Sequence, residues 1–235
     1  MIDGRKVLGL ITARGGSKAL PGKNLRRLGG RTLIDWCVAA ALGSRCIDRV
    51  VTSTDSAEIA KEARRCGSDV PFLRPAHLAG DDASSAAVLM HALDTLDESF
   101  DIVVLLQPTS PLRQAEDIDG CLALCVGAGA HSATSVCEAV PPPTWIYTLD
   151  DADRMQPILP ERPQTTRRQD QPTYYVSNGA VFVVTVPWFR DEQRFITGGT
   201  LAYVMPRERS VDIDDARDLW LAERIIHERQ QQGTQ

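Results

Sequence analysis

Short apolar runs alternate with helical segments over the first two thirds of the chain, and this alternation limits the fold more than any other feature. Runs rich in Val, Leu and Ile, such as 6–13, 48–54 and 101–112, are typical of strands buried on both faces. Strands that alternate with helices predict an α/β fold with three layers and a doubly wound, mostly parallel sheet. The expected helices are 31–43, 55–66, 84–96 and 116–126, and a further expected strand is 132–139.

The segment 141–172 interrupts this alternation. It contains three consecutive prolines and then a polar stretch, which predicts an irregular or hairpin excursion from the sheet. The sheet is expected to resume at 174–184, where the pair Asn178-Gly179 predicts a bulge or turn, and again at 201–206. The last segment begins with acidic residues and then has amphipathic spacing, so we expect a C-terminal helix whose polar tail frays after Arg229.

The length of 235 residues fits one sizeable domain, 1–235, with an arm inserted at 141–175. A net charge of −5 argues against a protein that coats nucleic acid. We see no signal peptide and no run approaching the ~20 apolar residues of a membrane span. We therefore expect a cytoplasmic protein with no nucleic-acid or membrane partner. The six cysteines lack CxxC spacing, which favours small buried side chains over a metal site.

A loop rich in glycine and cationic residues follows the first strand directly. Glycines let backbone N–H groups approach a ligand closely, while arginine, lysine and serine add charge and a hydroxyl. This donor set favours a polyphosphate ligand, and the alternative is a solvated surface loop. It is not a Walker A loop, because Gly16 and Gly22 are one residue too far apart and Asn24 replaces the hydroxyl residue. No GxGxxG fingerprint is present either.

Several separated blocks, in their order along the chain, resemble the acylneuraminate cytidylyltransferases, or CMP-sialic acid synthetases. The resemblance covers most of the chain and is weakest at 141–175. It implies a fold like that of the nucleotide-diphospho-sugar transferases and an enzyme that transfers CMP from CTP to an acidic acceptor, releasing pyrophosphate. The blocks are "ITARGGSKALPGKNLRRLGG", "RVVTSTDSAEIAKEA", "FLRPAHLAGDDASS", "LLQPTSPLR", "SNGAVF" and "VDIDD".

The resemblance implies that the opening loop binds the nucleotide and its phosphates. It also implies that Arg74 and Ser85, with backbone groups between them, recognise cytosine. A catalytic role is expected for Arg14, Lys18, Lys23 and Asp214. The full nucleotide-binding set that it implies is Arg14, Gly15, Gly16, Ser17, Lys18, Lys23, Asn24, Arg74, Ala83 and Ser85.

Two late aspartates are candidate magnesium ligands. Asp212 and Asp214 alternate along an extended stretch, which places both carboxylates on one face. From spacing alone, this interpretation and a role in capping the last helix are equally supported, because Asp214 and Asp215 precede that helix. The resemblance favours Mg²⁺, which prefers oxygen ligands.

Gln107 ends a buried strand at the edge where parallel sheets bind ligands. Its amide is either a structural hydrogen-bonding group or a substrate contact, and we favour the contact. By resemblance, Arg168 and Asn178 also bind the acceptor. The implied acceptor is a nonulosonic acid, such as N-acetylneuraminate or a relative. A phosphonate or an octulosonate is the alternative.

The acceptor region also departs from the family pattern. Trp145 lies near the place of a usual lysine, Val176 replaces an arginine, and Phe182 replaces a tyrosine. Trp145 and Phe182 either pack as ordinary aromatic side chains or line an acceptor pocket that is less polar than usual. No histidine falls in a motif, which favours metal-assisted loss of the acceptor proton over an imidazole base.

By resemblance, 141–175 is a dimerisation arm that helps to complete the neighbour's site, so we expect a homodimer. Two rival functions remain open at this point. One is a related pyrophosphorylase that uses UTP or a purine nucleotide. The other is a nucleotide-binding regulatory module without catalysis.

Overall fold

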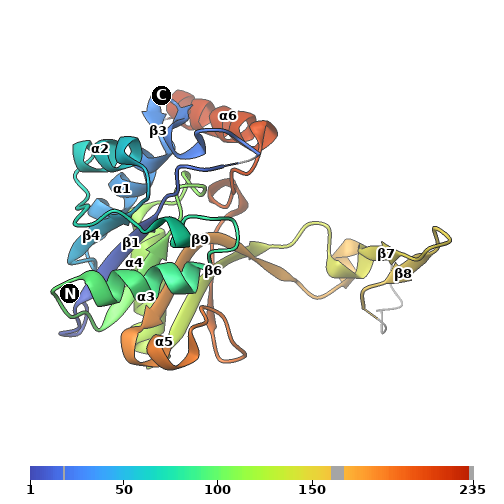
Figure 1. The fold of residues 1–235 in the computed structure, drawn as a ribbon. Coiled ribbons are helices and arrows are strands. Elements are labelled where there is room, and N and C mark those ends of the chain that lie inside the picture. Colours follow the sequence, from blue (N-terminus) through green and yellow to red (C-terminus); the bar gives the residue numbers. More distant parts are fainter. Residues whose placement is uncertain (18, 160–166, 233–235) are drawn as a thin grey trace.

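The computed structural model describes residues 1–17, 19–159 and 167–232. A six-stranded sheet with helices on both faces forms the body (Figure 1). Strand order is β10-β6-β9-β5-β1-β4, and every pair is parallel except those made by β9. The predicted α/β fold with a mostly parallel sheet is thus confirmed. The strands are β1 (Val7–Thr12), β4 (Arg49–Ser53), β5 (Ile102–Leu106), β6 (Ser132–Glu138), β9 (Tyr175–Thr185) and β10 (Leu201–Val204).

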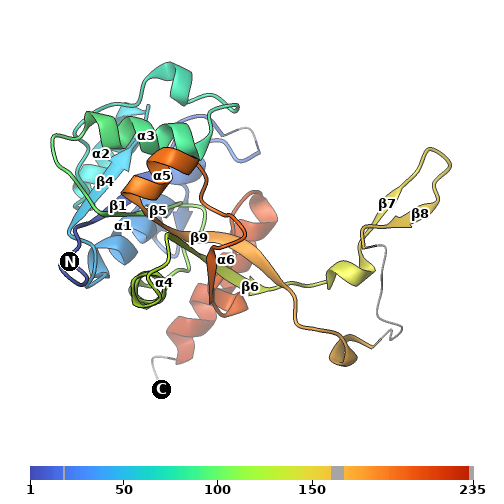
Figure 2. The same ribbon diagram turned by 90° about the horizontal axis from the view of Figure 1, so that it is seen from below.

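Helices cover both faces of the sheet because side chains of each strand alternate between them. In β1, Val7 and Ile11 pack into the cluster under α1, α2 and α4, while Leu8 and Leu10 pack under α3 and α5 (Figure 2). Burial on both faces explains why these strands read as continuous apolar runs. The helices are α1 (Leu33–Gly43), α2 (Ala57–Arg65), α3 (Ser85–Thr95), α4 (Ala115–Gly127), α5 (Val186–Glu192) and α6 (Ala216–Gln232).

Capping residues explain where the structure differs from the expected helix bounds. Helix α1 begins after Thr32, whose hydroxyl accepts a hydrogen bond from Asp35 N, and α3 begins after Ser84 in the same way. The short helix α5 and the hairpin of β2 (Arg27–Leu28) and β3 (Arg31–Thr32) are not in the sequence prediction. Helix α6 continues to Gln232, beyond the predicted fraying point at Arg229.

The Asn178-Gly179 pair forms the predicted bulge. Pairing between β6 and β9 shifts register between Thr134 and Val136, opposite this pair. Gly179 has a φ of 71°, in the left-handed region that glycine adopts without strain. The extra residues bring β9 toward the carboxyl end of β5, where the site described below lies.

Residues 141–175, called the arm from here on, extend away from the body (Figures 1 and 2). The arm carries an antiparallel hairpin of β7 (Tyr147–Leu149) and β8 (Met155–Pro157), so the expected hairpin excursion is present. Two short 3-10 turns flank it, Pro143–Trp145 and Arg168–Asp170. Within the described ranges, no helix has both the length and the apolar character needed to cross a bilayer.

A buried ion pair joins α4 to the segment that precedes α6. The Asp117 carboxylate is fully buried and accepts hydrogen bonds from Arg209 Nε at 2.9 Å and Nη2 at 2.7 Å. It also accepts one from Gln114 N at 3.0 Å, which completes a capping box at the start of α4. These contacts fix the start of α4 against the carboxyl-terminal segment.

We predict that Asp117→Ala lowers the free energy of unfolding by about 2–4 kcal/mol, because it removes a cap and leaves Arg209 without its partner. Urea unfolding followed by circular dichroism measures this change. Glu116→Ala, at an exposed position of the same turn, is the control and should cost no more than about 0.5 kcal/mol. Equal losses for the two variants would contradict the prediction.

Candidate functional site

A cavity of about 320 Å³ lies at the carboxyl ends of β1 and β5, beside the start of α3. This is the edge at which ligands bind open α/β sheets. The opening loop, the segment before α3, the end of β5 and the segment before α6 all contribute to it. The lining residues are Thr12, Arg14, Gly16, Ser17, Lys23, Asn24, Arg74, Leu78, Gly80, Asp81, Ala83, Ser85, Val88, Gln107, Pro108, Thr109 and Asp214.

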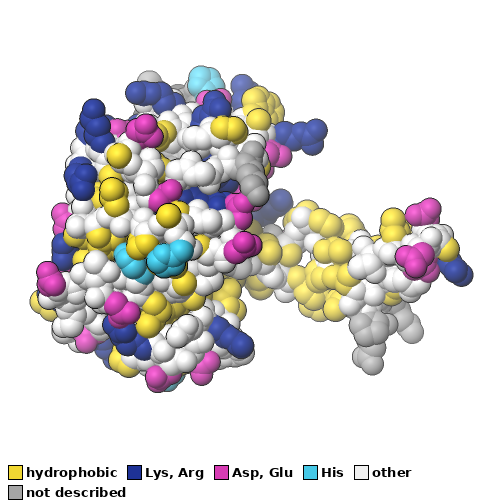
Figure 3. Space-filling model, in the orientation of Figure 1, with side chains coloured by type: hydrophobic (Ala, Val, Ile, Leu, Met, Phe, Trp, Pro, Cys, Tyr) yellow, Lys and Arg dark blue, Asp and Glu magenta, His cyan; other side chains and the backbone are white. Residues whose placement is uncertain are grey.

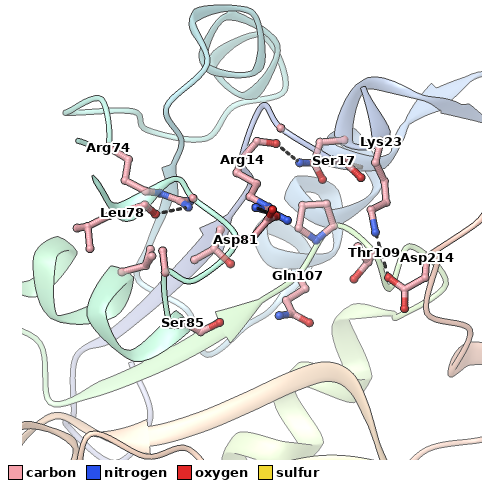
Figure 4. A pocket seen from close by; sticks show the side chains of 17 residues that line it. Arg14, Ser17, Lys23, Arg74, Leu78, Asp81, Ser85, Gln107, Thr109 and Asp214 are labelled. Carbon is pink, nitrogen blue, oxygen red and sulfur yellow. Dashed lines mark hydrogen bonds and ion pairs between the residues drawn. The ribbon is translucent and has the colours of Figure 1, made fainter. Parts of the chain in front are cut away.

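Arg14 and Lys23 bring positive charge into the cavity from the two ends of the opening loop (Figure 4). Lys23 Nζ donates hydrogen bonds to Ile213 O at 3.0 Å and to Asp214 Oδ1 at 3.1 Å. Its side chain is only 14% exposed. Arg14 Nη1 lies 2.6 Å from Asp81 Oδ1. The first strand's loop is therefore connected to the late acidic segment through Lys23.

Internal hydrogen bonds shape the opening loop. The buried Asn24 side chain donates to Arg14 O at 2.9 Å, which ties the two ends of the loop together. Gly15 N donates to Asp55 Oδ1 at 2.9 Å, so Gly15 faces the start of α2, while Gly16 and Ser17 line the cavity. Lys18, predicted to be catalytic, lies outside the described residues.

The predicted base-recognition residues lie on the side of the cavity nearest α3. Arg74 is 7% exposed, and its guanidinium donates to the hydroxyl and the carbonyl of Ser53 at the end of β4. Burial lowers the pKa of Arg74, the carboxylate of Asp55 opposes this, and the charge of Arg14 lowers the pKa further. Ser84 caps α3 by accepting from Ala87 N at 3.1 Å, so Ser85 is the member of the serine pair that lines the cavity.

Of the two predicted metal ligands, Asp214 lines the cavity, whereas Asp212 is not a lining residue and lies beside Gly179 of the bulge. Burial raises the pKa of Asp212, and the neighbouring charge of Asp214 raises it further, whereas a hydrogen bond from Thr109 opposes the rise. Helix capping is performed by Asp215, which accepts from Arg217 N at 2.7 Å and Asp218 N at 3.1 Å. The capping alternative is thus present for Asp215, whereas Asp214 Oδ1 accepts a hydrogen bond from Lys23 Nζ.

Gln107 lies at the end of β5 and lines the cavity together with Pro108 and Thr109. It lies close to the β9 bulge and to Asp212, since a β-carbon built on Gly179 would be 3.2 Å from Gln107 Oε1 and 3.5 Å from Asp212 Oδ2. The amide that we favoured as a substrate contact therefore lies between the nucleotide side and the acidic side of the site.

The other predicted acceptor residues do not line the cavity. The Asn178 amide is occupied internally: Oδ1 accepts from Ser135 Oγ at 2.6 Å, and Nδ2 donates to Ser210 Oγ at 2.9 Å. Phe182 packs against Phe195, with ring centroids 5.6 Å apart, which fits the packing alternative.

Trp145 lies on the arm with 45% of its surface exposed. Arg168 also lies on the arm, in a short 3-10 turn. The contacts of both residues with an acceptor therefore stay predictions.

Sequence reasoning missed several lining residues. Thr12 and Thr109 lie inside the predicted runs 6–13 and 101–112, and the structure places Thr12 at the end of β1 and Thr109 in the turn after β5. Asp81 lies in the segment 81–85, which the sequence places at the ligand edge, but no role is predicted for its side chain. Among the described residues, no group of three or more His, Cys, Asp or Glu side chains is arranged to hold a metal ion.

Comparison with known proteins decides the family. Residues 8–181 match the family model described as Cytidylyltransferase. The chain belongs to the cytidylyltransferase family. As a cytidylyltransferase it is a CTP-dependent nucleotidyltransferase, which confirms the family and the class of reaction expected from the sequence.

Three relatives of this cytidylyltransferase align over almost its whole length. CMP-N,N'-diacetyllegionaminic acid synthase of Legionella pneumophila is 34% identical, covering 94% of this chain and 96% of that protein. N-acylneuraminate cytidylyltransferase of Escherichia coli is 32% identical over 97% of this chain and 54% of that longer protein. Pseudaminic acid cytidylyltransferase of Campylobacter jejuni is 30% identical over 95% of this chain and 98% of that protein.

Two solved structures share the fold. CMP:2-keto-3-deoxy-manno-octonic acid synthetase, solved in complex with CTP, superposes with a TM-score of 0.70 at 17% identity, covering 95% of this chain and 99% of that one. 4-Diphosphocytidyl-2C-methyl-D-erythritol synthase from Anaerococcus prevotii superposes with a TM-score of 0.65 at 12% identity, covering 96% and 98%. Both support the assigned architecture of the cytidylyltransferase.

We predict that Lys23→Met weakens CTP binding by about ten- to a hundredfold, because a hydrogen bond to a charged group contributes about 1.5–3 kcal/mol. Isothermal titration calorimetry with CTP measures the change. Lys61→Met, on the exposed face of α2, is the matched control and should bind CTP like the wild type. Unchanged affinity in Lys23→Met would show that this ammonium does not contact the nucleotide.

Proposed function

We propose that the protein transfers CMP from CTP to a hydroxyl group of a nonulosonic acid and releases pyrophosphate. Three relatives at 30–34% identity bear the names of enzymes for legionaminic, N-acylneuraminic and pseudaminic acids, which supports this class of acceptor. The names of these relatives specify different acids, but all three specify CMP or a cytidylyl group as what is attached to the acid. An octulosonate is the second candidate, favoured by the fold shared with the 2-keto-3-deoxy-manno-octonic acid synthetase.

The contact between Lys23 and Asp214 carries the proposal. It joins a cationic loop after the first strand to a carboxylate 191 positions later, at the rim of one cavity. Cytidylyl transfer needs positive charge where the pyrophosphate leaves and oxygen ligands for a divalent ion beside it. The two sides of this cavity supply both.

Charge compensation and positioning are the tasks of the chain's own residues. We infer that Arg14 and Lys23 bind the triphosphate and compensate the charge that grows on the leaving pyrophosphate. Gln107 would orient the acceptor so that its hydroxyl lies in line with the α-phosphorus. No histidine is among the lining residues in the described part of the chain, so no imidazole base is assigned to the acceptor proton.

Asp212 and Asp214 fit Mg²⁺, which is commonly held by one or two carboxylates together with substrate phosphates and water. The raised pKa of Asp212 reflects a crowded, partly desolvated carboxylate, an environment that a bound cation would stabilise. When bound, Mg²⁺ would withdraw charge from the phosphate oxygens. Because CTP is a cytoplasmic metabolite, we also propose that the enzyme acts in the cytoplasm.

We predict that the protein releases pyrophosphate from CTP only when a suitable acid is present, and prefers CTP to UTP, ATP and GTP. The experiment offers each nucleotide with a panel of nonulosonic, octulosonic and phosphonate acids and measures pyrophosphate. Product mass identifies the CMP-acid. A chelator should abolish turnover, and Asp212→Asn should need more magnesium than the wild type.

Glu223→Gln, which removes an exposed carboxylate from α6, is the control for Asp212→Asn and should keep the wild-type magnesium requirement. Equal turnover of all four nucleotides would favour the rival pyrophosphorylase. CTP binding without turnover of any acid would favour the regulatory module.

We propose in addition that the enzyme is a homodimer formed through the arm. Five large apolar side chains of the arm are 40–65% exposed, and Figure 3 shows hydrophobic side chains gathered along it. A two-stranded hairpin is only marginally stable alone, and large exposed apolar patches mark interaction surfaces. A second copy of the chain would cover this surface. The five residues are Trp145, Ile146, Leu149, Met155 and Ile158.

We predict that sedimentation equilibrium gives twice the 25.7 kDa chain mass for the wild type and the single chain mass for Leu149→Asp combined with Met155→Asp. Two buried charges in an apolar interface would oppose association. The control is Leu221→Asp, which changes an exposed leucine of α6 and should leave the dimer intact. A monomeric wild type would contradict the proposal.

A further inference from the structure

Arg113 is a buried cation that contacts the backbone of Gln107, a residue that lines the cavity. Its side chain is 3% exposed. No ion pair joins it to a carboxylate within the described ranges. Its guanidinium donates to Ala180 O at 2.6 Å, to Gln107 O at 3.3 Å and to Cys37 Sγ at 2.8 Å, while Nε has no partner there. Burial of a charge that only neutral acceptors compensate costs free energy, so we ask which interaction of Arg113 offsets this cost.

That interaction lies at the end of the ladder between β5 and β9. Regular pairing stops at Leu106 opposite Val181. The next facing positions are Gln107 and Ala180, where Ala180 N donates to Asn178 Oδ1 at 3.2 Å instead of to the Gln107 carbonyl across the ladder. The two carbonyls instead accept hydrogen bonds from the same Arg113 nitrogen, Nη1. Arg113 therefore bridges the two strands at the point where their backbones separate.

The residues that this bridge holds lie at the cavity and beside Asp212. Gln107 lines the cavity, and its Oε1 and Asp212 Oδ2 both lie near Gly179, next to Ala180 in the bulge. On the other side of Gly179, the Asn178 amide is fixed by Ser135 and Ser210. The bulge is thus held from both sides, by Asn178 and by Arg113.

We propose that Arg113 is a positioning residue for the transfer step. It holds the Gln107 and Ala180 backbones so that the Gln107 amide stays beside Asp212, between the acceptor and the metal ligand. This inference rests on the proposed function and adds a residue that touches neither substrate. A lysine would not reproduce this bridge, because its single ammonium on a flexible stem lacks the rigid planar group that places Nη1 between the two carbonyls.

The experiment compares Arg113→Lys with Cys37→Ala. Cys37→Ala removes another contact of the same guanidinium, away from the site, and serves as the control for lost core packing. Arg113→Lys should lower kcat with CTP and the accepted acid by about a hundredfold, since displacement by about 1 Å can cost that much. Its KM for CTP should stay near the wild-type value. Cys37→Ala should lose stability while it keeps its kcat.

Hydrogen exchange provides a readout that does not need turnover. In Arg113→Lys, amides of 105–110 and 177–182 should exchange faster than in the wild type, while those of β1 and α3 should not. Equal kcat in Arg113→Lys and wild type, or equal loss in both variants, would overturn the proposal. A wild type that turns over none of the acids would overturn the proposed function instead, and the exchange measurement would still decide the role of Arg113.

Discussion

Parallel pairing of β1 with both β4 and β5 is the constraint on which the site depends. Because the three strands run in one direction, their carboxyl ends meet at one edge, and the loops that follow them must share that space. The opening loop, the Ser53 end of β4 and Gln107 come together for this reason alone. The antiparallel β9 adds a different contribution: its bulge, rather than its end, reaches the same edge beside Gln107. The ends of β1, β4 and β5 therefore form one part of the site, and the bulge within β9 forms the other part.

Charges in the cavity are arranged in pairs across separate segments. Arg14 lies against Asp81, and Lys23 against Asp214. Partly exposed pairs of this kind contribute little to stability, so exchanging a carboxylate for a phosphate oxygen costs little free energy. The same carboxylates partly neutralise the positive charge of Arg14 and Lys23. An acidic protein can thus hold a site for a polyanion without a basic surface.

Sequence reasoning recovered the nucleotide side of the site much better than the acceptor side, and the reason is physical. Arg14 and Lys23 lie in a short loop after a predicted strand, where the residue types already favour a polyphosphate ligand, and Ser85 is expected from the family resemblance. Arg113 lies in a quoted block too, but its importance depends on which carbonyls a buried guanidinium reaches, and pairing between β5 and β9 sets that. The antiparallel direction of β9 and its register shift are tertiary properties that periodicity within one segment does not encode.

The difference between the nucleotide side and the acceptor side of the site bears on which acid the enzyme would accept. The nucleotide side is built from loops tied to the sheet by backbone hydrogen bonds, so its shape is set by the fold. On the acceptor side, Phe182 packs inward and Val176 lies at a strand position on the way to the arm, so neither supplies a polar group to the cavity. In the proposed homodimer, polar recognition there would depend on Gln107 and on side chains from the arm of a second copy. Discrimination between acids with many hydroxyl groups requires matched hydrogen bonds, because an unpaired polar group in a closed site is costly. The residues that select the acid are therefore expected on the arm, where the chain departs most from the family pattern, and not in the opening loop, which we propose binds the nucleotide.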